Sequence, residues 1–302
     1  MTDAEIITRL CAQIENADDV LEPREWRALA DNLRARGLRP SELPALPEPK
    51  LRETAGKLHT ARLRGLLKRG AAFDRKLAEY KSQGIGVVTL ADAAYPGRLR
   101  KVPGAPPLFF YAGDLALTEL PLLGFAGSRN PDALDIELTR LYVDRALKRG
   151  MGIVAGGARG IDREAVTEAL ANGGFAVEYV CDTLSRRVKD EQIAREIAQG
   201  RRVLLSAVNP DAGFTTGFAM QRNRFIYANA LATIAIAAEN GRGGTWAGAI
   251  DALRHGFTVY VPNDEREGSM ELIRRGAVPI SADWDAAVKE PGQSGQLSLL
   301  DL

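Results

Sequence analysis

Three glycine-containing turns, each placed directly after a short apolar run, constrain this chain more than any other feature. The turns are Gly127-Ser128-Arg129, Gly156-Gly157-Ala158-Arg159-Gly160 and Gly241-Arg242-Gly243-Gly244-Thr245. In an open parallel sheet the carboxyl ends of the strands share one edge, and ligands bind there. Glycine lets backbone N–H groups approach an anion, and a following helix adds the positive end of its dipole. The three turns therefore predict a single site for a phosphorylated ligand.

Apolar runs alternate with amphipathic stretches from Leu122 onward. The expected strands are 122–126, 152–155, 175–180, 202–206, 232–238 and 257–261, with helices at 134–148, 163–171 and 191–198 between them. This alternation is typical of βαβ units. We expect an α/β fold with a Rossmann-like, mostly parallel sheet and helices on both faces. Asn130-Pro131 predicts a helix entry with Asn as the cap, and Asp162 is expected to cap a helix that begins at Arg163.

The residues before this core predict a small helical domain. Thr2-Asp3-Ala4-Glu5 has the pattern of a capping box, and Pro23 is placed to start a second helix. A strand is expected from Gly86, followed by extended, proline-rich chain. We therefore expect three parts. These are a helical domain at 1–83, a Rossmann-like domain at 84–288 and a flexible tail at 289–302.

Positive charge is concentrated in one part of the helical domain. Residues 50–81 hold ten Lys or Arg against three Asp or Glu, although the whole chain carries a net charge of only +1. Such clustering suits contact with an acidic polymer. A solvated helix face explains it equally well, and the sequence leaves both interpretations open.

The scarcity of histidine and cysteine limits the chemistry that the chain can perform. His59 and His255 are the only histidines, and Cys11 and Cys181 the only cysteines. This supply argues against a structural zinc site and a Ser–His or Cys–His nucleophile. We expect no cofactor, no metal and no catalysis. The apolar runs are shorter than the roughly 20 residues that span a bilayer, and no leader pattern opens the chain, so we expect a cytoplasmic protein that works by binding.

A fourth motif, Arg222-Asn223-Arg224, carries two guanidiniums around an amide. That combination suits a phosphodiester backbone, and Phe218 nearby is a candidate to stack on a base. The alternative is that these arginines pair with buried carboxylates and stabilise the sheet edge.

In their order, these motifs resemble the DNA-processing protein A (DprA/Smf) family from about residue 84 to residue 278. The match is carried by Tyr95-Pro96 with Leu99, the Gly127 and Gly156 turns, Arg222-Asn223-Arg224 with Ile226, Glu239, Gly243-Gly244-Thr245 and Val261-Pro262. The resemblance implies a homodimer that binds single-stranded DNA in a basic pocket and helps to load a recombinase. It also implies that Ser128, Arg129 and the Gly156–Gly160 turn hold phosphates, with Arg222 and Arg224 beside them.

The chain also departs from the family pattern. Glu164-Ala165-Val166 stands where the family has Ala-His, Ser206-Ala207 where it has Ser-Glu, and Arg242-Gly243-Gly244 where it has Ser-Gly. We also expect the winged-helix domain of many members to be missing.

The alternative to a DNA-binding protein is a Rossmann-like nucleotide sensor or a nucleoside-monophosphate-processing protein. LOG-type phosphoribohydrolases place a glutamate after a similar glycine turn, whereas residues 246–249 hold no carboxylate, so hydrolysis is disfavoured while nucleotide binding stays open.

The end of the chain resembles a sliding-clamp-binding peptide. Its residues Gln296, Leu297, Leu299 and Leu300 would enter pockets on the clamp from a flexible terminus. An adaptor that joins the clamp to a recombinase or nuclease is thus a third interpretation. The sequence leaves open whether the process is DNA uptake, repair or defence.

Overall fold

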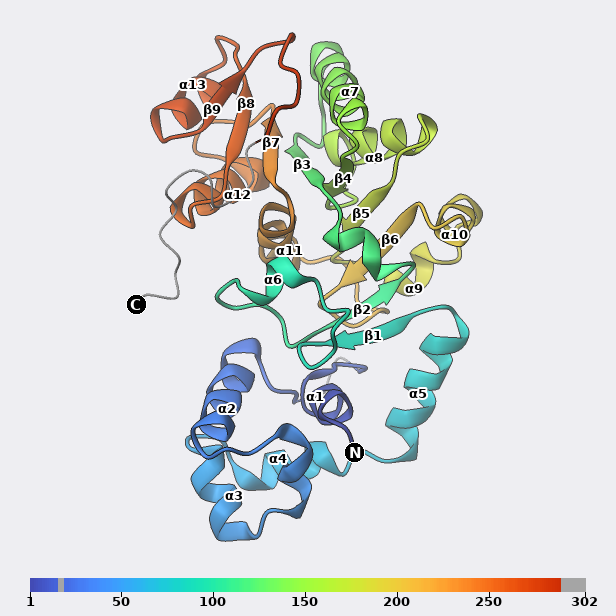
Figure 1. Ribbon diagram of the computed structural model, residues 1–302, viewed down its shortest axis with the longest axis vertical. Coiled ribbons are helices and arrows are strands. Elements are labelled where there is room, and N and C mark those ends of the chain that lie inside the picture. Colours follow the sequence, from blue (N-terminus) through green and yellow to red (C-terminus); the bar gives the residue numbers. More distant parts are fainter. Residues whose placement is uncertain (16–18, 289–302) are drawn as a thin grey trace.

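The computed structural model describes residues 1–15 and 19–288, which form a helical region and an α/β core (Figure 1). The helical region holds α1 (Asp3–Cys11), α2 (Pro23–Ala35), α3 (Glu48–Ala55), α4 (Thr60–Leu67) and α5 (Ala71–Ser82). The capping box expected at the first helix is confirmed. Thr2 Oγ1 accepts the backbone N–H of Glu5 at 3.2 Å, and the Glu5 carboxylate accepts the N–H of Thr2 at 2.7 Å.

The core is one nine-stranded, mostly parallel sheet, which confirms the expected fold class. Its strands are β1 (Gly86–Thr89), β2 (Leu108–Ala112), β3 (Leu122–Gly127), β4 (Gly152–Ala155), β5 (Ala176–Tyr179), β6 (Arg202–Ser206), β7 (Ala232–Ile236), β8 (Val259–Pro262) and β9 (Val278–Ile280). They are ordered β1-β2-β6-β5-β4-β3-β7-β8-β9, and only the β1–β2 and β2–β6 pairs are antiparallel. The sequence pattern did not predict β2 or β9.

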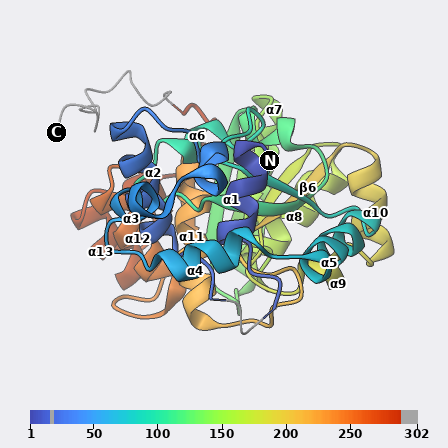
Figure 2. The same ribbon diagram turned by 90° about the horizontal axis from the view of Figure 1, so that it is seen from below.

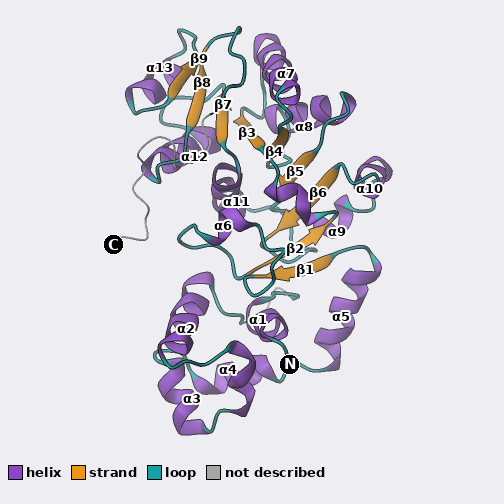
Figure 3. Ribbon diagram, in the orientation of Figure 1, coloured by secondary structure: helices purple, strands orange, loops and turns teal. Residues whose placement is uncertain are grey.

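Helices cover both faces of the sheet (Figure 3). They include α6 (Gly97–Arg100), α7 (Ala133–Lys148), α8 (Ile161–Ala171), α9 (Leu184–Arg187), α10 (Glu191–Ala198), α11 (Thr216–Asn229), α12 (Gly243–Arg254) and α13 (Glu267–Arg274). Successive strand residues point to opposite faces. Leu123 and Ile153 pack with α7 and α8, whereas Leu122 and Val154 pack with α11. β3 and β4 are therefore apolar on both sides, as is typical of a parallel sheet covered on both faces.

Two helix caps differ from the expectations. The cap of α7 is Asp132 rather than Asn130, because its carboxylate accepts the N–H of Asp135 at 2.9 Å and the Asp135 side chain reciprocates at 3.0 Å. The cap of α8 is Gly160 rather than Asp162. Gly160 has a φ of +87°, and a Cβ there would lie 2.2 Å from the backbone oxygen of Ser128, so only glycine fits this close approach.

Part of the basic stretch at 50–81 is neutralised by neighbouring carboxylates. Arg62 pairs with Glu25 at 2.7 Å, and Lys76 pairs with Asp211 at 3.0 Å. These contacts favour a structural role for Arg62 and Lys76.

None of the helices within residues 1–15 and 19–288 has the length and apolar character needed to cross a membrane.

Candidate functional site

The chain order of the strands reverses direction at β3. From β3 the chain runs through β4 and β5 to β6 on one side, and it then returns to place β7 on the other side of β3. Such a switch point leaves a crevice outside the carboxyl ends of the strands. The turns that follow β3, β4 and β7 all reach this crevice, which holds two adjoining pockets.

We call the first of them the arginine pocket; its volume is about 250 Å³. It is lined by Arg129, Gly156, Gly157, Ala158, Arg159, Arg163, Cys181, Asp182, Arg187, Phe214 and Arg222. The second, the switch-point pocket, has a volume of about 410 Å³. It is lined by Ala126, Gly127, Ser128, Arg129, Ala158, Asp162, Phe214, Thr216, Ala219, Met220, Arg222, Asn223, Ala237, Glu239, Arg242, Gly243, Gly244 and Thr245.

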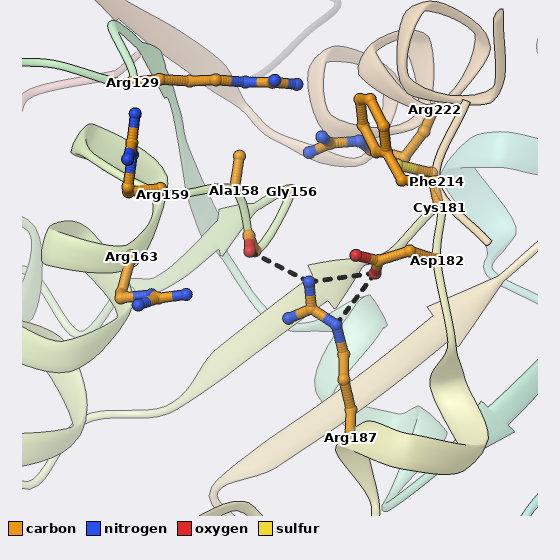
Figure 4. Close-up of a pocket in the computed structure, with 11 residues that line it drawn as sticks. Arg129, Gly156, Ala158, Arg159, Arg163, Cys181, Asp182, Arg187, Phe214 and Arg222 are labelled. Atoms are coloured by element: carbon orange, nitrogen blue, oxygen red, sulfur yellow. Dashed lines mark hydrogen bonds and ion pairs between the residues drawn. The ribbon is translucent and has the colours of Figure 1, made fainter. Parts of the chain in front are cut away.

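The five guanidiniums of the arginine pocket differ in how they are neutralised (Figure 4). Arg187 pairs with Asp182 at 3.1 Å, and Arg222 pairs with Asp162 at 3.3 Å. Arg159 donates at 2.8 Å to the neutral side-chain oxygen of Asn130 and makes no ion pair within residues 1–15 and 19–288. The guanidiniums of Arg129 and Arg163 make no ion pair with any residue that the structure describes. The pocket consequently carries excess positive charge.

Arg222 is held in place by an ion pair with Asp162 of α8. The side chains of Arg222 and Asp162 are 6% and 8% exposed, and the Asp162 carboxylate also accepts the N–H of Gly156 at 3.1 Å. Burial raises the pKa of Asp162, and the attraction of Arg222 opposes this rise. A Cβ on Gly156 would lie 0.7 Å from Arg222 Nη1. Only glycine fits at position 156, because the Arg222 guanidinium occupies the space that a side chain would need.

Arg129 and Phe214 form the boundary between the two pockets. The guanidinium carbon lies 5.0 Å from the ring centroid of Phe214, a cation–π contact. Phe214 is nevertheless half exposed as a residue, at 49%. An exposed aromatic face beside an unpaired guanidinium suits a planar, unsaturated ring next to an anion.

The switch-point pocket is formed by the turns after β3 and β7. Ser128 N–H donates to the carbonyl of Ile236 at 3.3 Å, which ties the two turns together. Asn223 donates from its side chain to the carbonyl of Gly244 at 3.2 Å and fixes the start of α12. Ala237, directly after β7, has a φ of +53°, a left-handed conformation that non-glycine residues adopt rarely.

Most residues suggested by the sequence meet at this edge. Those that line one or both pockets are Gly127, Ser128, Arg129, Gly156, Gly157, Arg159, Arg222, Asn223, Gly243, Gly244 and Thr245. Gly160, Phe218 and Arg224 do not line them. Arg224 instead pairs at 3.1 Å with Asp251, whose side chain is 38% exposed. The pairing with a buried carboxylate that was left open for this motif is made by Arg222 with Asp162. Gln296, Leu297, Leu299 and Leu300 lie outside the described residues.

Four residues that bring a charged or aromatic side chain to the arginine pocket were not expected from the sequence: Arg163, Asp182, Arg187 and Phe214. Phe214 could have been suggested as a pocket residue by its place in a Gly-Phe-Thr-Thr turn directly before a helix. For the other three there was little local signal, because their place at the pocket depends on how α8 and α9 pack. No cluster of three potential metal ligands occurs among the residues that the structure describes.

The chain is similar to proteins of one family. A family model described as DNA recombination-mediator protein A matches residues 86–290. DNA processing protein DprA of Bacillus subtilis is 27% identical over 220 residues, which cover 70% of this chain and 72% of that protein. DNA processing protein DprA of Streptococcus pneumoniae is 27% identical over 206 residues, which cover 65% of this chain and 71% of that protein.

Solved structures show the same fold. The X-ray structure of DNA processing protein A from Streptococcus pneumoniae has a TM-score of 0.72 at 20% identity, and the match covers 93% of this chain and 95% of that chain. A structure of DNA processing protein A from Helicobacter pylori, described for its single-stranded DNA binding mode, has a TM-score of 0.56 at 23% identity. That match covers 66% of this chain and 92% of the other.

Proposed function

This chain belongs to the DNA recombination-mediator protein A family, and we propose that it binds single-stranded DNA at the crevice formed by β3, β4 and β7, without catalysing a reaction. The observation that carries the proposal is the excess positive charge of the arginine pocket. Arg129 and Arg163 face it without a carboxylate partner among the described residues, and Arg159 contacts only an amide. The description of the Helicobacter pylori relative as a single-stranded-DNA-binding protein supports the same ligand.

Each part of the site has a role in this proposal. The guanidiniums of Arg129 and Arg163 bind phosphate oxygens, for which their planar donor geometry is suited. The exposed ring of Phe214 stacks on a base that has left the helix, so an unpaired strand binds better than a duplex. Because phosphates provide most contacts, binding is largely independent of sequence and weakens with salt.

The remaining parts of the proposal concern partners and organisation. We propose that residues 1–83 and 84–288 act as separate domains of a cytoplasmic homodimer that promotes recombination by loading a recombinase. The peptide Gln296–Leu300 would bind the sliding clamp. Deletion of residues 296–302 should then abolish capture of purified clamp and leave the affinity for single-stranded DNA unchanged. Clamp capture by the truncated chain would exclude this role of the peptide.

Fluorescence anisotropy with a labelled single-stranded oligonucleotide tests the main proposal directly. The affinity is measured at about 50 mM and 200 mM salt, a range over which phosphate-dominated binding weakens by orders of magnitude. Unlabelled duplex and mononucleotides serve as competitors. We expect tight, salt-sensitive binding that the duplex displaces poorly. Absence of binding at the lower salt concentration contradicts the proposal.

A nucleotide sensor is the second candidate, and the switch-point pocket favours it. Ser128, Arg242 and the start of α12 supply anion-binding groups, while Ala126 and Met220 supply apolar surface beside them. Thermal stabilisation by a mononucleotide, together with displacement of the labelled oligonucleotide by the same compound, identifies this function.

A further inference from the structure

Helix α5 of the helical region contacts the loop that leads from β6 to the pocket. Figures 1 and 2 both place α5 beside α9. The Tyr80 side chain is 1% exposed, and its hydroxyl lies 3.0 Å from Asn209 Oδ1 and 2.9 Å from Asp211 Oδ2. Burial raises the pKa of Tyr80, so the hydroxyl keeps its proton and donates. The helical region therefore makes a polar contact with the core loop that is buried at Tyr80 and Asn209 and exposed to solvent at Asp211.

Asp211 is the centre of this contact. It accepts hydrogen bonds from Ser185 Oγ at 2.5 Å and from Tyr80, and it pairs with Lys76 Nζ at 3.0 Å. Burial alone would raise the pKa of Asp211, but the hydrogen bonds from Ser185, Lys76 and Tyr80 outweigh burial and lower it. The ionised carboxylate consequently holds α5, α9 and the loop together.

The same loop is attached to the arginine pocket. Thr183 N–H donates to the carbonyl of Ala212 at 2.7 Å, and Ser185 N–H donates to the carbonyl of Pro210 at 3.0 Å. Phe214, two residues beyond Ala212, lines the pocket, and so does Arg187, two residues beyond Ser185. The Arg187 guanidinium also donates to the carbonyl of Gly157 at 3.1 Å. A continuous chain of contacts thus runs from α5 to three pocket residues.

We propose that Tyr80 and Asp211 are positioning residues that set the affinity for single-stranded DNA from the side of the helical region. They hold the loop that carries Phe214 and the segment that carries Arg187. This inference rests on the proposed function, because the pocket ligand is taken to be DNA. Since coupling between sites is reciprocal, an oligonucleotide in the pocket also stabilises the contact between α5 and the loop.

The test compares the full chain with Tyr80→Phe, which removes only the hydroxyl. We expect Tyr80→Phe to weaken oligonucleotide binding by up to about fivefold, the limit set by the loss of one hydrogen bond. The salt dependence should stay unchanged because no phosphate contact is removed. In hydrogen exchange without DNA, residues 207–216 should exchange faster in the variant. Oligonucleotide binding should slow exchange in α5 of the unsubstituted chain, and less so in the variant.

Tyr95→Phe is the matched control. Tyr95 is equally buried, and its hydroxyl donates to the carbonyl of Pro106 at 2.7 Å, but neither residue lines either pocket. Asp211→Ala provides a second variant that acts from the loop side. The loss of affinity in the double variant Tyr80→Phe/Asp211→Ala should be smaller than the sum of the two single losses, because both substitutions remove the Tyr80–Asp211 contact. It should still exceed the loss in Asp211→Ala, in which Tyr80 keeps Asn209 as an acceptor.

The outcomes separate this inference from the proposed function. If the unsubstituted chain binds the oligonucleotide and Tyr80→Phe binds equally tightly, the positioning role is overturned while the DNA site stands. Equal losses in Tyr80→Phe and Tyr95→Phe also overturn it, because a general loss of packing would then suffice. If the unsubstituted chain binds no oligonucleotide, the proposed function fails and the inference fails with it.

Discussion

The Arg222 guanidinium lies 3.3 Å from the Asp162 carboxylate and directly beside Gly156, and the side chains of Arg222 and Asp162 are almost fully buried. A buried, paired guanidinium in this position stabilises the packing of α11 against α8 and the Gly156 turn. Part of its charge is already balanced, whereas Arg129 above it faces the pocket without a carboxylate partner among the described residues. We infer that Arg222 shapes the pocket and Arg129 contacts the ligand.

Arg222→Ala should destabilise the fold by about 3–5 kcal/mol, because Asp162 would remain buried without its countercharge. Arg224→Ala is the matched control from the same helix. Its pair with Asp251 is more than one-third exposed on both sides, so the expected loss is about 0–1 kcal/mol. Urea denaturation at pH 7 measures both free energies of unfolding. Similar losses in the two variants would mean that burial does not distinguish the pairs.

Gly156→Ala should destabilise the protein by roughly 2–4 kcal/mol, since the new Cβ would displace Arg222 from Asp162. Gly65→Ala, in the interior of α4, introduces a methyl group with no atom within 4 Å. That control should be neutral or stabilising by about 0.5–1 kcal/mol. Thermal and urea unfolding provide the comparison. A fully stable Gly156→Ala protein would show that Arg222 can move aside.

Arg129→Ala should weaken binding of single-stranded oligonucleotides and reduce the salt slope by about one, the effect of losing one phosphate contact. Arg27, exposed on α2 and outside both pockets, gives the control Arg27→Ala. Anisotropy titrations over a series of salt concentrations yield both quantities. An unchanged slope in Arg129→Ala removes this residue from the DNA contact.

Phe214→Ala and Phe218→Ala distinguish the aromatic residue that the structure places at the pocket from the one suggested by the sequence. Stacking on one base contributes about 1–3 kcal/mol. Phe214→Ala should therefore lower the affinity about fivefold or more, while Phe218→Ala should leave it nearly unchanged. With an abasic oligonucleotide the effect of Phe214→Ala should shrink. A larger loss in Phe218→Ala would reverse the assignment.

The Glu25–Arg62 pair predicts a pH-dependent contribution from the helical region. Hydrogen bonding from Arg62 lowers the pKa of Glu25 below its ordinary value of 4.5. A lowered pKa in the folded state stabilises the protein fully above pH 4.5, and this contribution is lost as the pH falls through the folded-state pKa. Glu25→Gln should thus be less stable than the unsubstituted chain at pH 7, with a difference that shrinks below pH 4.5.

Urea midpoints measured from pH 7 to pH 3 follow this difference. Arg62→Met serves as the companion variant, because it removes the cause of the shift and should flatten the same part of the profile. A stability difference that stays constant over this range would show that the pair contributes no pH dependence.

The sequence by itself determined the fold class, because strand and helix periodicity are local properties of the chain. The alternation from Leu122 onward indicated the parallel core, and the turns at Gly127 and Gly156 indicated which edge of the sheet gathers polar groups. Two strands had no comparable local signal. β2 follows Pro106-Pro107 and pairs with β6, almost a hundred residues away, while β9 has only three residues.

Only the tertiary structure decided which charges remain available for a ligand. Arg222 pairs with Asp162, sixty residues away in the chain, and Arg224 pairs with Asp251. The packing of α8 and of the loop before α11 brings Arg163 and Phe214 to the pocket in the same way. Ion pairing and burial depend on groups that are distant in sequence, so the spacing of residue types shows where a site forms and the fold selects the side chains that serve it.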